Sequence, residues 1–370
     1  MAKSRLHQLS ELGQSVWIDQ ITREWLQDGT LRRLMDEDAV VGVTSNPTIF
    51  EKAISSGDSY DEQLKEVLEW QEDPKEAFYH LAVRDIQDAC DTLRPVWDAG
   101  QGRDGYVSME VDPNLAYDRE ATIQEAIRLH EWIDRPNLFV KIPATEDGLG
   151  AIEECIAQGR SINVTLIFAL QRYREVAEAY VRGLERLVEA GGDPGKVASV
   201  ASFFVSRVDT EADRRLEEIG SEEALSLRGK LAVANAKLAY AAWKEIFAGG
   251  RWEALAGKGA TAQRCLWAST STKNPEYRDV LYVEELIGPE TVDTMPLETT
   301  HAFQDHGEVA LTLEAGLDEA REVFERLAAV GVDYDDVTDT LEREGVEKFA
   351  DSFGQLLEGV ESKRGQLVRT

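Results

Sequence analysis

The stretch NLFVKIPAT at residues 137–145 places a lysine, Lys141, inside a run of otherwise uncharged and mostly apolar residues. Side chains of a β-strand alternate between its two faces. In this run Val140 and Ile142 share one face, and Lys141 shares the other with Phe139. An ammonium group is costly to bury, so a lysine in this setting needs a partner or a chemical purpose. We therefore expect Lys141 to point into a pocket.

Other apolar stretches carry polar side chains at equivalent positions, on a face that turns polar toward the carboxyl end of the stretch. Charged residues are seldom buried without a partner or a function, whereas a lone asparagine or threonine in an interior is more often simply hydrogen-bonded. In a barrel of parallel strands, catalytic groups enter at the carboxyl ends of the strands. We expect the following residues to meet there with Lys141: Asp19, Asn46, Glu110, Asn163 and Thr165.

A lysine beside carboxylates in a pocket depleted of water suits one kind of chemistry. A neutral amine attacks a ketone carbonyl and forms a Schiff base, and the iminium then lets a neighbouring carbon–carbon bond break or form. Carboxylates such as Glu110 and Asp19 can move the protons that this chemistry requires. Thr165 could hold a water between Glu110 and Lys141. Two other interpretations of Lys141 stay open: a phosphate anchor, and an ion-pair partner of Glu110.

Eight short apolar stretches alternate with longer segments of helical spacing, such as ATIQEAIRLHEWI. This alternation predicts an α/β fold, and eight strands predict a (β/α)8 TIM barrel with additional helices, a single domain over residues 1–370. An open doubly wound sheet is the alternative. We expect residues from about 308–370 to form a C-terminal helical extension packed on the barrel. The predicted strand regions are 15–19, 39–46, 105–112, 137–145, 161–168, 197–207, 264–272 and 292–299.

The composition argues against several classes of function. The formal net charge of −30 disfavours nucleic acid as a partner, because binding a phosphate backbone needs a basic face. No apolar run is long enough for a transmembrane helix, and the first residues lack the apolar segment of a signal peptide. The three cysteines and five histidines lack metal-ligand spacing. We therefore expect a cytoplasmic protein with no membrane partner and no metal.

Five segments resemble, in order, the signature segments of the transaldolase family: VTSNPTIF at 43–50, SMEVDP at 108–113, FVKIPAT at 139–145, INVTLIF at 162–168 and SFFVSR at 202–207. The chain is most similar to the longer bacterial type, including the transaldolase part of fusions with glucose-6-phosphate isomerase. The resemblance implies a (β/α)8 barrel, a lysine Schiff base and no cofactor. The implied reaction, in the pentose phosphate pathway, moves a dihydroxyacetone unit from sedoheptulose 7-phosphate to glyceraldehyde 3-phosphate, giving erythrose 4-phosphate and fructose 6-phosphate.

The resemblance also implies a role for each matching residue. Lys141 would form the Schiff base, and Asp19 would act as acid and base when the carbon–carbon bond breaks. Glu110 and Thr165 would position a catalytic water at the imine. The implied substrate-binding residues are Thr44, Asn46, Asn163, Ser202, Phe204 and the phosphate-binding Arg207.

The segment ASTSTK at 268–273 departs from the family pattern, in which a second phosphate-binding arginine follows the seventh strand. Ser269, Ser271 or Lys273 must take that role, and a lysine offers a point charge where an arginine offers a planar fork. Two other functions stay open: an aldolase of the same superfamily that releases free dihydroxyacetone, and a catalytically silent barrel that binds sugar phosphates. The expected partners are sugar-phosphate substrates, bound by a monomer or a homodimer.

Overall fold

The eight predicted strand regions all contain β-strands in the computed structural model, which describes residues 4–55 and 57–367. The strands are β1 (Gln14–Ile18), β2 (Val40–Val43), β3 (Tyr106–Glu110), β4 (Leu138–Pro143), β5 (Ile162–Ile167), β6 (Ser199–Phe204), β7 (Arg264–Ala268) and β8 (Thr291–Met295). Each strand pairs in parallel with the next, and β8 pairs with β1, which closes the sheet. The predicted (β/α)8 TIM barrel is confirmed, and the open-sheet alternative is wrong.

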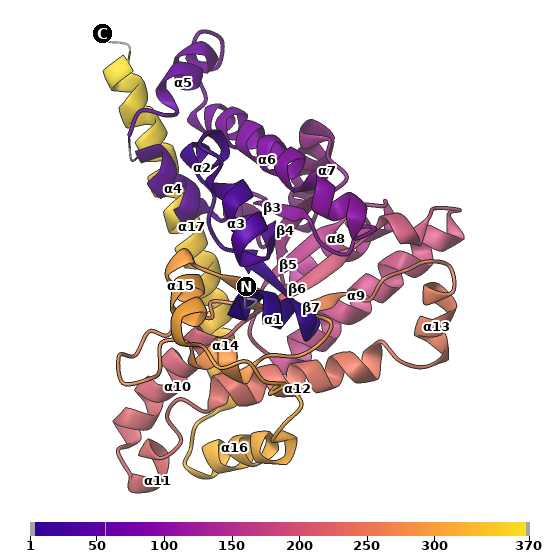
Figure 1. Cartoon of the computed structure of the whole chain (residues 1–370), viewed down its shortest axis with the longest axis vertical. Helices are drawn as coiled ribbons and strands as arrows, with labels where there is room; N and C mark the ends of the chain where they lie inside the picture. Colours follow the sequence, from indigo (N-terminus) through magenta and orange to yellow (C-terminus); the bar gives the residue numbers. More distant parts are fainter. Residues whose placement is uncertain (1–3, 56, 368–370) are drawn as a thin grey trace.

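Helices surround the central strands (Figure 1). They are α1 (Arg5–Glu11), α2 (Arg23–Gln27), α3 (Thr30–Asp38), α4 (Pro47–Ser55), α5 (Asp61–Leu68), α6 (Pro74–Ala99), α7 (Arg119–Ile133), α8 (Glu146–Ala157), α9 (Leu170–Glu189), α10 (Ser206–Ile219), α11 (Glu222–Leu225), α12 (Leu231–Ile246), α13 (Gly250–Ala256), α14 (Leu281–Glu285), α15 (Leu297–His306), α16 (Leu317–Ala329) and α17 (Tyr334–Leu367), with 3₁₀ turns η1 (Pro113–Leu115) and η2 (Pro194–Lys196). Within the described ranges, no helix is both long and apolar enough to cross a membrane.

Several strands end earlier than the apolar pattern predicts. The region 197–207 contains β6, but α10 begins at Ser206, so Arg207 lies in the first turn of a helix. The region 292–299 contains β8, but α15 begins at Leu297 after Pro296. Proline cannot donate a ladder hydrogen bond, which suits the end of a strand. Many polar residues of interest therefore lie just beyond the strands, where the chain turns toward the next helix.

Aromatic side chains fill the barrel directly beneath these strand ends. The rings of Tyr106 and Phe139 are stacked with centroids 4.0 Å apart, and Trp17 lies 6.1 Å from Phe139. Gly42 on β2 makes room for this layer, because a Cβ at that position would lie 2.4 Å from the Trp17 ring. Phe139 precedes Lys141 by two residues on the same face of β4. The ring layer thus forms a rigid floor below the lysine.

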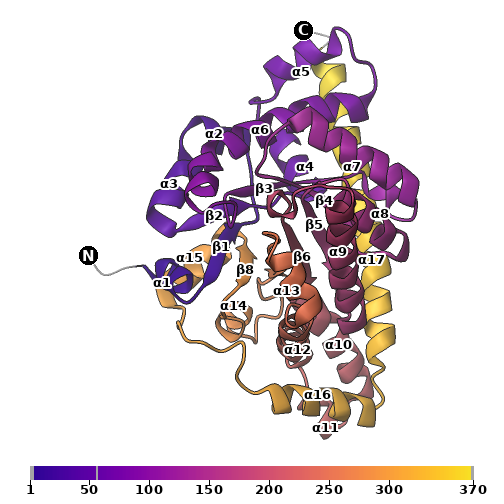
Figure 2. The ribbon, with the colours of Figure 1, turned by 90° about the vertical axis from the view of Figure 1, so that its right-hand side faces the viewer.

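Helix α17 has 34 residues and is roughly 50 Å long at the usual rise of an α-helix. Figure 2 shows it as a straight rod along one side of the molecule, between α16 and α5. It contacts α4, α6, α10 and β5. The proposed extension of about 308–370 thus includes α16 and α17, and its last three residues lie outside the described residues.

We predict that Gly42→Ala destabilises the protein by about 1–3 kcal/mol, because the new methyl group must displace the Trp17 ring within a packed layer. Chemical denaturation of the variant and the wild type measures this difference. Gly354→Ala on α17 is the matched control: no atom lies within 4 Å of its added Cβ, so its stability should be unchanged or higher by up to about 1 kcal/mol. Equal stability of Gly42→Ala and wild type would show that the floor is loosely packed.

Candidate active site

A cavity of about 130 Å³ opens at the carboxyl ends of the strands. Every predicted site residue lines it except Glu110 and Asn163. The predicted residues that line it are Asp19, Thr44, Asn46, Lys141, Thr165, Ser202, Phe204, Arg207, Ser269, Ser271 and Lys273. Ala268, Thr294, Pro296 and Phe349 complete the lining. The structure thus brings residues from strands spread along the sequence to one small polar cavity.

Lys141 is fixed by two neighbours at this cavity. The parallel register places it beside Glu110 on β3 and Asn163 on β5. Its Nζ lies 3.3 Å from Glu110 Oε2 and donates a 2.9 Å hydrogen bond to the carbonyl oxygen of Ser45. Lys141 and Glu110 are both buried. The amine therefore has a defined position, directed at the cavity by one carboxylate and one carbonyl group.

Two buried oxygen atoms near the lysine can each accept a further hydrogen bond. Glu110 Oε2 contacts Lys141 as an ion pair but forms no hydrogen bond within the described residues, and Thr165 Oγ1 forms none there either. Burial raises the pKa of Glu110, the Lys141 ammonium counteracts part of that rise, and the nearby Asp19 charge adds to it. A carboxyl group with a raised pKa exchanges protons more readily near neutral pH.

Asp19 lies across the cavity mouth from these groups, just after β1. Its Oδ1 accepts a 2.6 Å hydrogen bond from Thr44 Oγ1, which in turn lies 2.7 Å from Thr294 Oγ1. Desolvation raises the pKa of Asp19, although Lys141, the Thr44 hydrogen bond and Lys273 all act in the opposite direction. Asp19 and Glu110 are thus two separate carboxyl groups, both with raised pKa values, near one lysine.

The two predicted asparagines occupy different positions. Asn163 lies below the cavity, where its amide donates to Ser108 Oγ at 3.1 Å and its oxygen accepts from Ser202 Oγ at 2.6 Å. Asn46 lines the cavity, and its Oδ1 accepts from the Ile49 backbone N–H in the first turn of α4 at 3.1 Å. Asn163 therefore orients Ser202, whereas Asn46 borders the cavity itself.

Two cations enter the cavity without a carboxylate partner. Arg207 forms no hydrogen bond or ion pair within the part of the chain that the structure describes, and desolvation lowers its pKa while the charge of Glu344 raises it. Lys273 Nζ donates to Ser271 Oγ at 2.7 Å. Desolvation and the nearby Arg207 charge lower the pKa of Lys273, whereas the charges of Asp19 and Glu298 raise it. Ser269 Oγ lies instead 2.9 Å from Ser206 Oγ. Two unneutralised cations in so acidic a chain favour an anionic ligand.

Sequence reasoning missed four residues of the cavity: Ala268, Thr294, Pro296 and Phe349. Thr294 lies on the inward face of β8, and the alternation of VDTMPLET contained that signal. Phe349 comes from α17, and no local pattern distinguishes it from the other apolar residues on that helix. Only the packing of α17 across the barrel brings it to the site.

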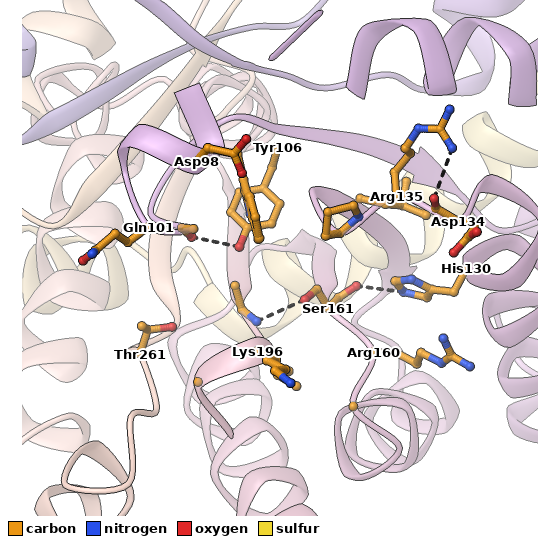
Figure 3. Close-up of a pocket in the computed structure, with 18 residues that line it drawn as sticks. Asp98, Gln101, Tyr106, His130, Asp134, Arg135, Arg160, Ser161, Lys196 and Thr261 are labelled. Carbon is orange, nitrogen blue, oxygen red and sulfur yellow. Dashed lines mark hydrogen bonds between the residues drawn. The ribbon is translucent and has the colours of Figure 1, made fainter. Parts of the chain in front are cut away.

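Figure 3 shows a larger cavity of about 670 Å³. Its lining residues lie mostly in segments that lead into strands, or at the first residue of a strand as Tyr106 and Leu138 do, so the cavity lies at the opposite end of the barrel. None of the predicted site residues is among them. The ionisable groups there have neighbours of their own: Arg135 binds Asp91 through two hydrogen bonds, and the His130 ring nitrogen lies 3.0 Å from the Ser161 carbonyl oxygen. Burial lowers the pKa of His130 to about 4. Catalytic groups of such barrels lie at the other end, so we assign the site to the smaller cavity.

The described residues contain no group of three or more His, Cys, Asp or Glu side chains arranged to hold a metal ion. The three cysteines are buried and unpaired.

The chain matches one family model and relatives of known name. The family model described as Transaldolase/Fructose-6-phosphate aldolase matches residues 16–360. A transaldolase of Frankia alni is 54% identical over 362 residues, which cover 98% of this chain and 98% of the relative. A transaldolase of Acidothermus cellulolyticus is 55% identical over 356 residues, 96% of this chain and 95% of the relative. A transaldolase of Mycobacterium ulcerans is 51% identical over 371 residues, 99% of both chains.

The family model spans nearly the whole chain. The three relatives are each more than 50% identical to the chain and align with at least 95% of it. The chain belongs to the transaldolase/fructose-6-phosphate aldolase family.

Proposed function

We propose that the protein is a transaldolase, which transfers a dihydroxyacetone unit from sedoheptulose 7-phosphate to glyceraldehyde 3-phosphate through a Schiff base on Lys141. The observation that carries this proposal is the buried lysine amine, held 3.3 Å from Glu110 at a cavity that also receives Asp19 and the unpaired cation of Arg207. A nucleophilic amine, two proton-transfer groups and a phosphate anchor are the parts that the reaction needs.

In the first stage the Lys141 ammonium passes a proton to Glu110, and the resulting amine attacks the ketone carbonyl carbon of the donor. A proton then moves from the nitrogen to the former carbonyl oxygen, which gives a neutral carbinolamine. The carbinolamine hydroxyl then gains a proton and leaves as water. The carbon–nitrogen bond remains and becomes the iminium. We assign the proton transfers to Glu110, acting through a water held between Glu110 Oε2 and Thr165 Oγ1. Both atoms are buried; Thr165 Oγ1 forms no hydrogen bond within the described residues, and Glu110 Oε2 contacts only the Lys141 amine there, so each has capacity for that water.

In the second stage Asp19 takes the proton from the hydroxyl group on the carbon that leaves. The carbon–carbon bond breaks, its electron pair moves toward the iminium nitrogen, and the released aldehyde leaves an enamine on Lys141. The enamine then attacks the acceptor aldehyde, and Asp19 returns the proton to the new hydroxyl group. Hydrolysis of the iminium by the reverse of the first stage frees the product and the lysine.

We assign phosphate binding to Arg207 and Lys273, because both cations line the cavity and neither forms an ion pair with a carboxylate of the described residues. Arg207 offers the planar fork and Lys273, supported by Ser271, the second charge. We assign the hydroxyl groups of the dihydroxyacetone unit to Asn46 and Thr44 at the cavity surface, with Ser202 oriented by Asn163. The Phe204 ring forms an apolar part of the cavity lining.

An aldolase that releases free dihydroxyacetone is the second candidate, because the matching family model covers both activities. The curated relatives named above are all transaldolases and match over their full length, which favours transfer. Incubation with fructose 6-phosphate alone separates the two functions: an aldolase accumulates dihydroxyacetone, whereas a transaldolase turns over only when erythrose 4-phosphate is added.

The wider setting follows from the same proposal. We propose a cytoplasmic enzyme of the pentose phosphate pathway that acts as a monomer or a homodimer on sugar phosphates, with residues from about 308 to 370 as an extension of the barrel.

We predict that borohydride in the presence of fructose 6-phosphate reduces a Schiff base on Lys141 and adds the reduced substrate fragment to that residue. Peptide mass spectrometry locates the adduct. Lys237 is an internal control, because it is also buried but lies 3.1 Å from Glu285 outside the cavity, and it should stay unmodified. Unmodified Lys141 under these conditions would rule out the covalent mechanism and would favour a silent sugar-phosphate-binding barrel.

We predict that Asp19→Asn still forms the borohydride adduct but transfers dihydroxyacetone about 10²–10⁴ times more slowly, because the isosteric amide cannot accept the hydroxyl proton. In the wild type the transfer rate should fall as the pH drops through the pKa of Asp19. Because desolvation raises that pKa, the fall should occur at a higher pH than an exposed aspartate would give. A coupled assay for erythrose 4-phosphate-dependent transfer measures both effects. Wild-type rates in Asp19→Asn would contradict the role of Asp19.

A further inference from the structure

Helix α17 supplies one wall of the active-site cavity through a single aromatic side chain, Phe349. The residue is buried and lines the same cavity as Lys141 and Arg207. The centre of its ring lies 5.8 Å from Lys141 Nζ and 6.0 Å from Arg207 Cζ. The C-terminal helix therefore reaches both the proposed nucleophile and the proposed phosphate anchor.

The Arg207 guanidinium lies near two aromatic rings. Phe204 lies 5.3 Å from Arg207 Cζ, and Phe349 lies 6.0 Å from it. The Arg207 side chain has no hydrogen bond or ion pair within residues 4–55 and 57–367. The charge of Glu344, also on α17, raises the pKa of Arg207, which desolvation lowers. Ring contacts of this kind attract a guanidinium electrostatically and leave its N–H groups available for a ligand.

The sequence of α17 explains how Phe349 reaches this position. Gly345 lies against the end of β5, where an added Cβ would lie 3.0 Å from the Leu166 side chain and 3.5 Å from Phe168. The absence of a side chain at Gly345 lets the helix approach the barrel closely. Phe349 follows Gly345 by four residues, so both lie on the same face of the helix.

The next turn of α17 packs against α4 and α6. Ser352 Oγ accepts a 2.9 Å hydrogen bond from Thr48 Oγ1 of α4. The Phe353 ring packs edge-on against Phe78 with centroids 5.8 Å apart. The close approach at Gly345 and the Ser352 hydrogen bond, before and after Phe349 in the sequence, hold its ring at the cavity.

We propose that Phe349 is a positioning residue of the active site: its ring, together with Phe204, orients the Arg207 guanidinium for substrate phosphate and covers the Lys141 amine. This inference rests on the proposed function, since it names how α17 serves that site. If Phe349 has this role, the preference for phosphorylated substrates depends on α17, a helix that follows all eight barrel strands in the sequence.

Two substitutions distinguish the effect of the aromatic ring of Phe349 from the effect of its apolar volume. Phe349→Leu keeps an apolar cover over Lys141 but removes the ring from Arg207, and Phe349→Tyr keeps the ring. We expect Phe349→Leu to weaken binding of inorganic phosphate, and to raise KM for glyceraldehyde 3-phosphate, by about tenfold. The kcat of Phe349→Leu and its kcat/KM with unphosphorylated glyceraldehyde should change less than about twofold, and Phe349→Tyr should restore phosphate binding. Titration calorimetry and transfer kinetics measure these values.

Phe353→Leu is the matched control on the same helix, because its ring packs on Phe78 outside the cavity. It should lower the unfolding temperature and leave phosphate binding unchanged. Phosphate binding by Phe349→Leu equal to wild type would overturn the proposal, and so would an equal loss in Phe353→Leu, because the effect would then be a general loosening of α17.

The calorimetry also keeps this inference separate from the proposed function. If the wild type binds phosphate in a way that depends on the Phe349 ring but transfers nothing, the positioning role stands and the transaldolase proposal fails. If the wild type transfers dihydroxyacetone but binds no phosphate, the positioning role fails and the proposed function stands.

Discussion

The buried contact between Lys141 and Glu110 is the constraint on which the rest of the site depends. Two opposite charges 3.3 Å apart inside a protein lose hydration that their attraction does not fully recover. A buried ion pair of this kind contributes little to the stability of the fold. We therefore explain its position by its chemistry. The parallel register of β3, β4 and β5 holds the pair beside Asn163, and the aromatic rings of Trp17, Tyr106 and Phe139 pack against one another inside the barrel.

The acidic character of the chain gives this small cavity a second constraint. The protein has a formal net charge of −30, which repels an anionic substrate. Binding such a substrate therefore requires positive charge at the site itself. Arg207 and Lys273 supply that charge at the cavity, because no carboxylate of the described residues forms an ion pair with either side chain. Many other arginines are paired, as Arg251 is with Glu178 and Glu185. At the larger cavity at the other end of the barrel, Arg135 and Arg160 are paired with Asp91 and Glu131.

Most of the barrel and much of the site could be predicted from the sequence, because both depend on a period of two along each strand. That period separated Lys141 and Glu110 from their apolar neighbours and placed them on the inner face. It did not locate the strand ends, since the last residues of 197–207 and 292–299 have strand-like composition but follow the turn into a helix. It also gave no indication of Phe349, because contact between α17 and β5 depends on a close approach at Gly345 that no local pattern reveals.

The central claim is that Lys141 becomes covalently bonded to the substrate while Arg207 and Lys273 hold its phosphate. A crystal structure of the protein frozen after soaking with fructose 6-phosphate tests this most directly. We predict continuous electron density between Lys141 Nζ and the former carbonyl carbon of the sugar, with the phosphate group within hydrogen-bond distance of Arg207. A sugar phosphate bound in the cavity with no bond to Lys141, or bound only at the opposite end of the barrel, would contradict the account.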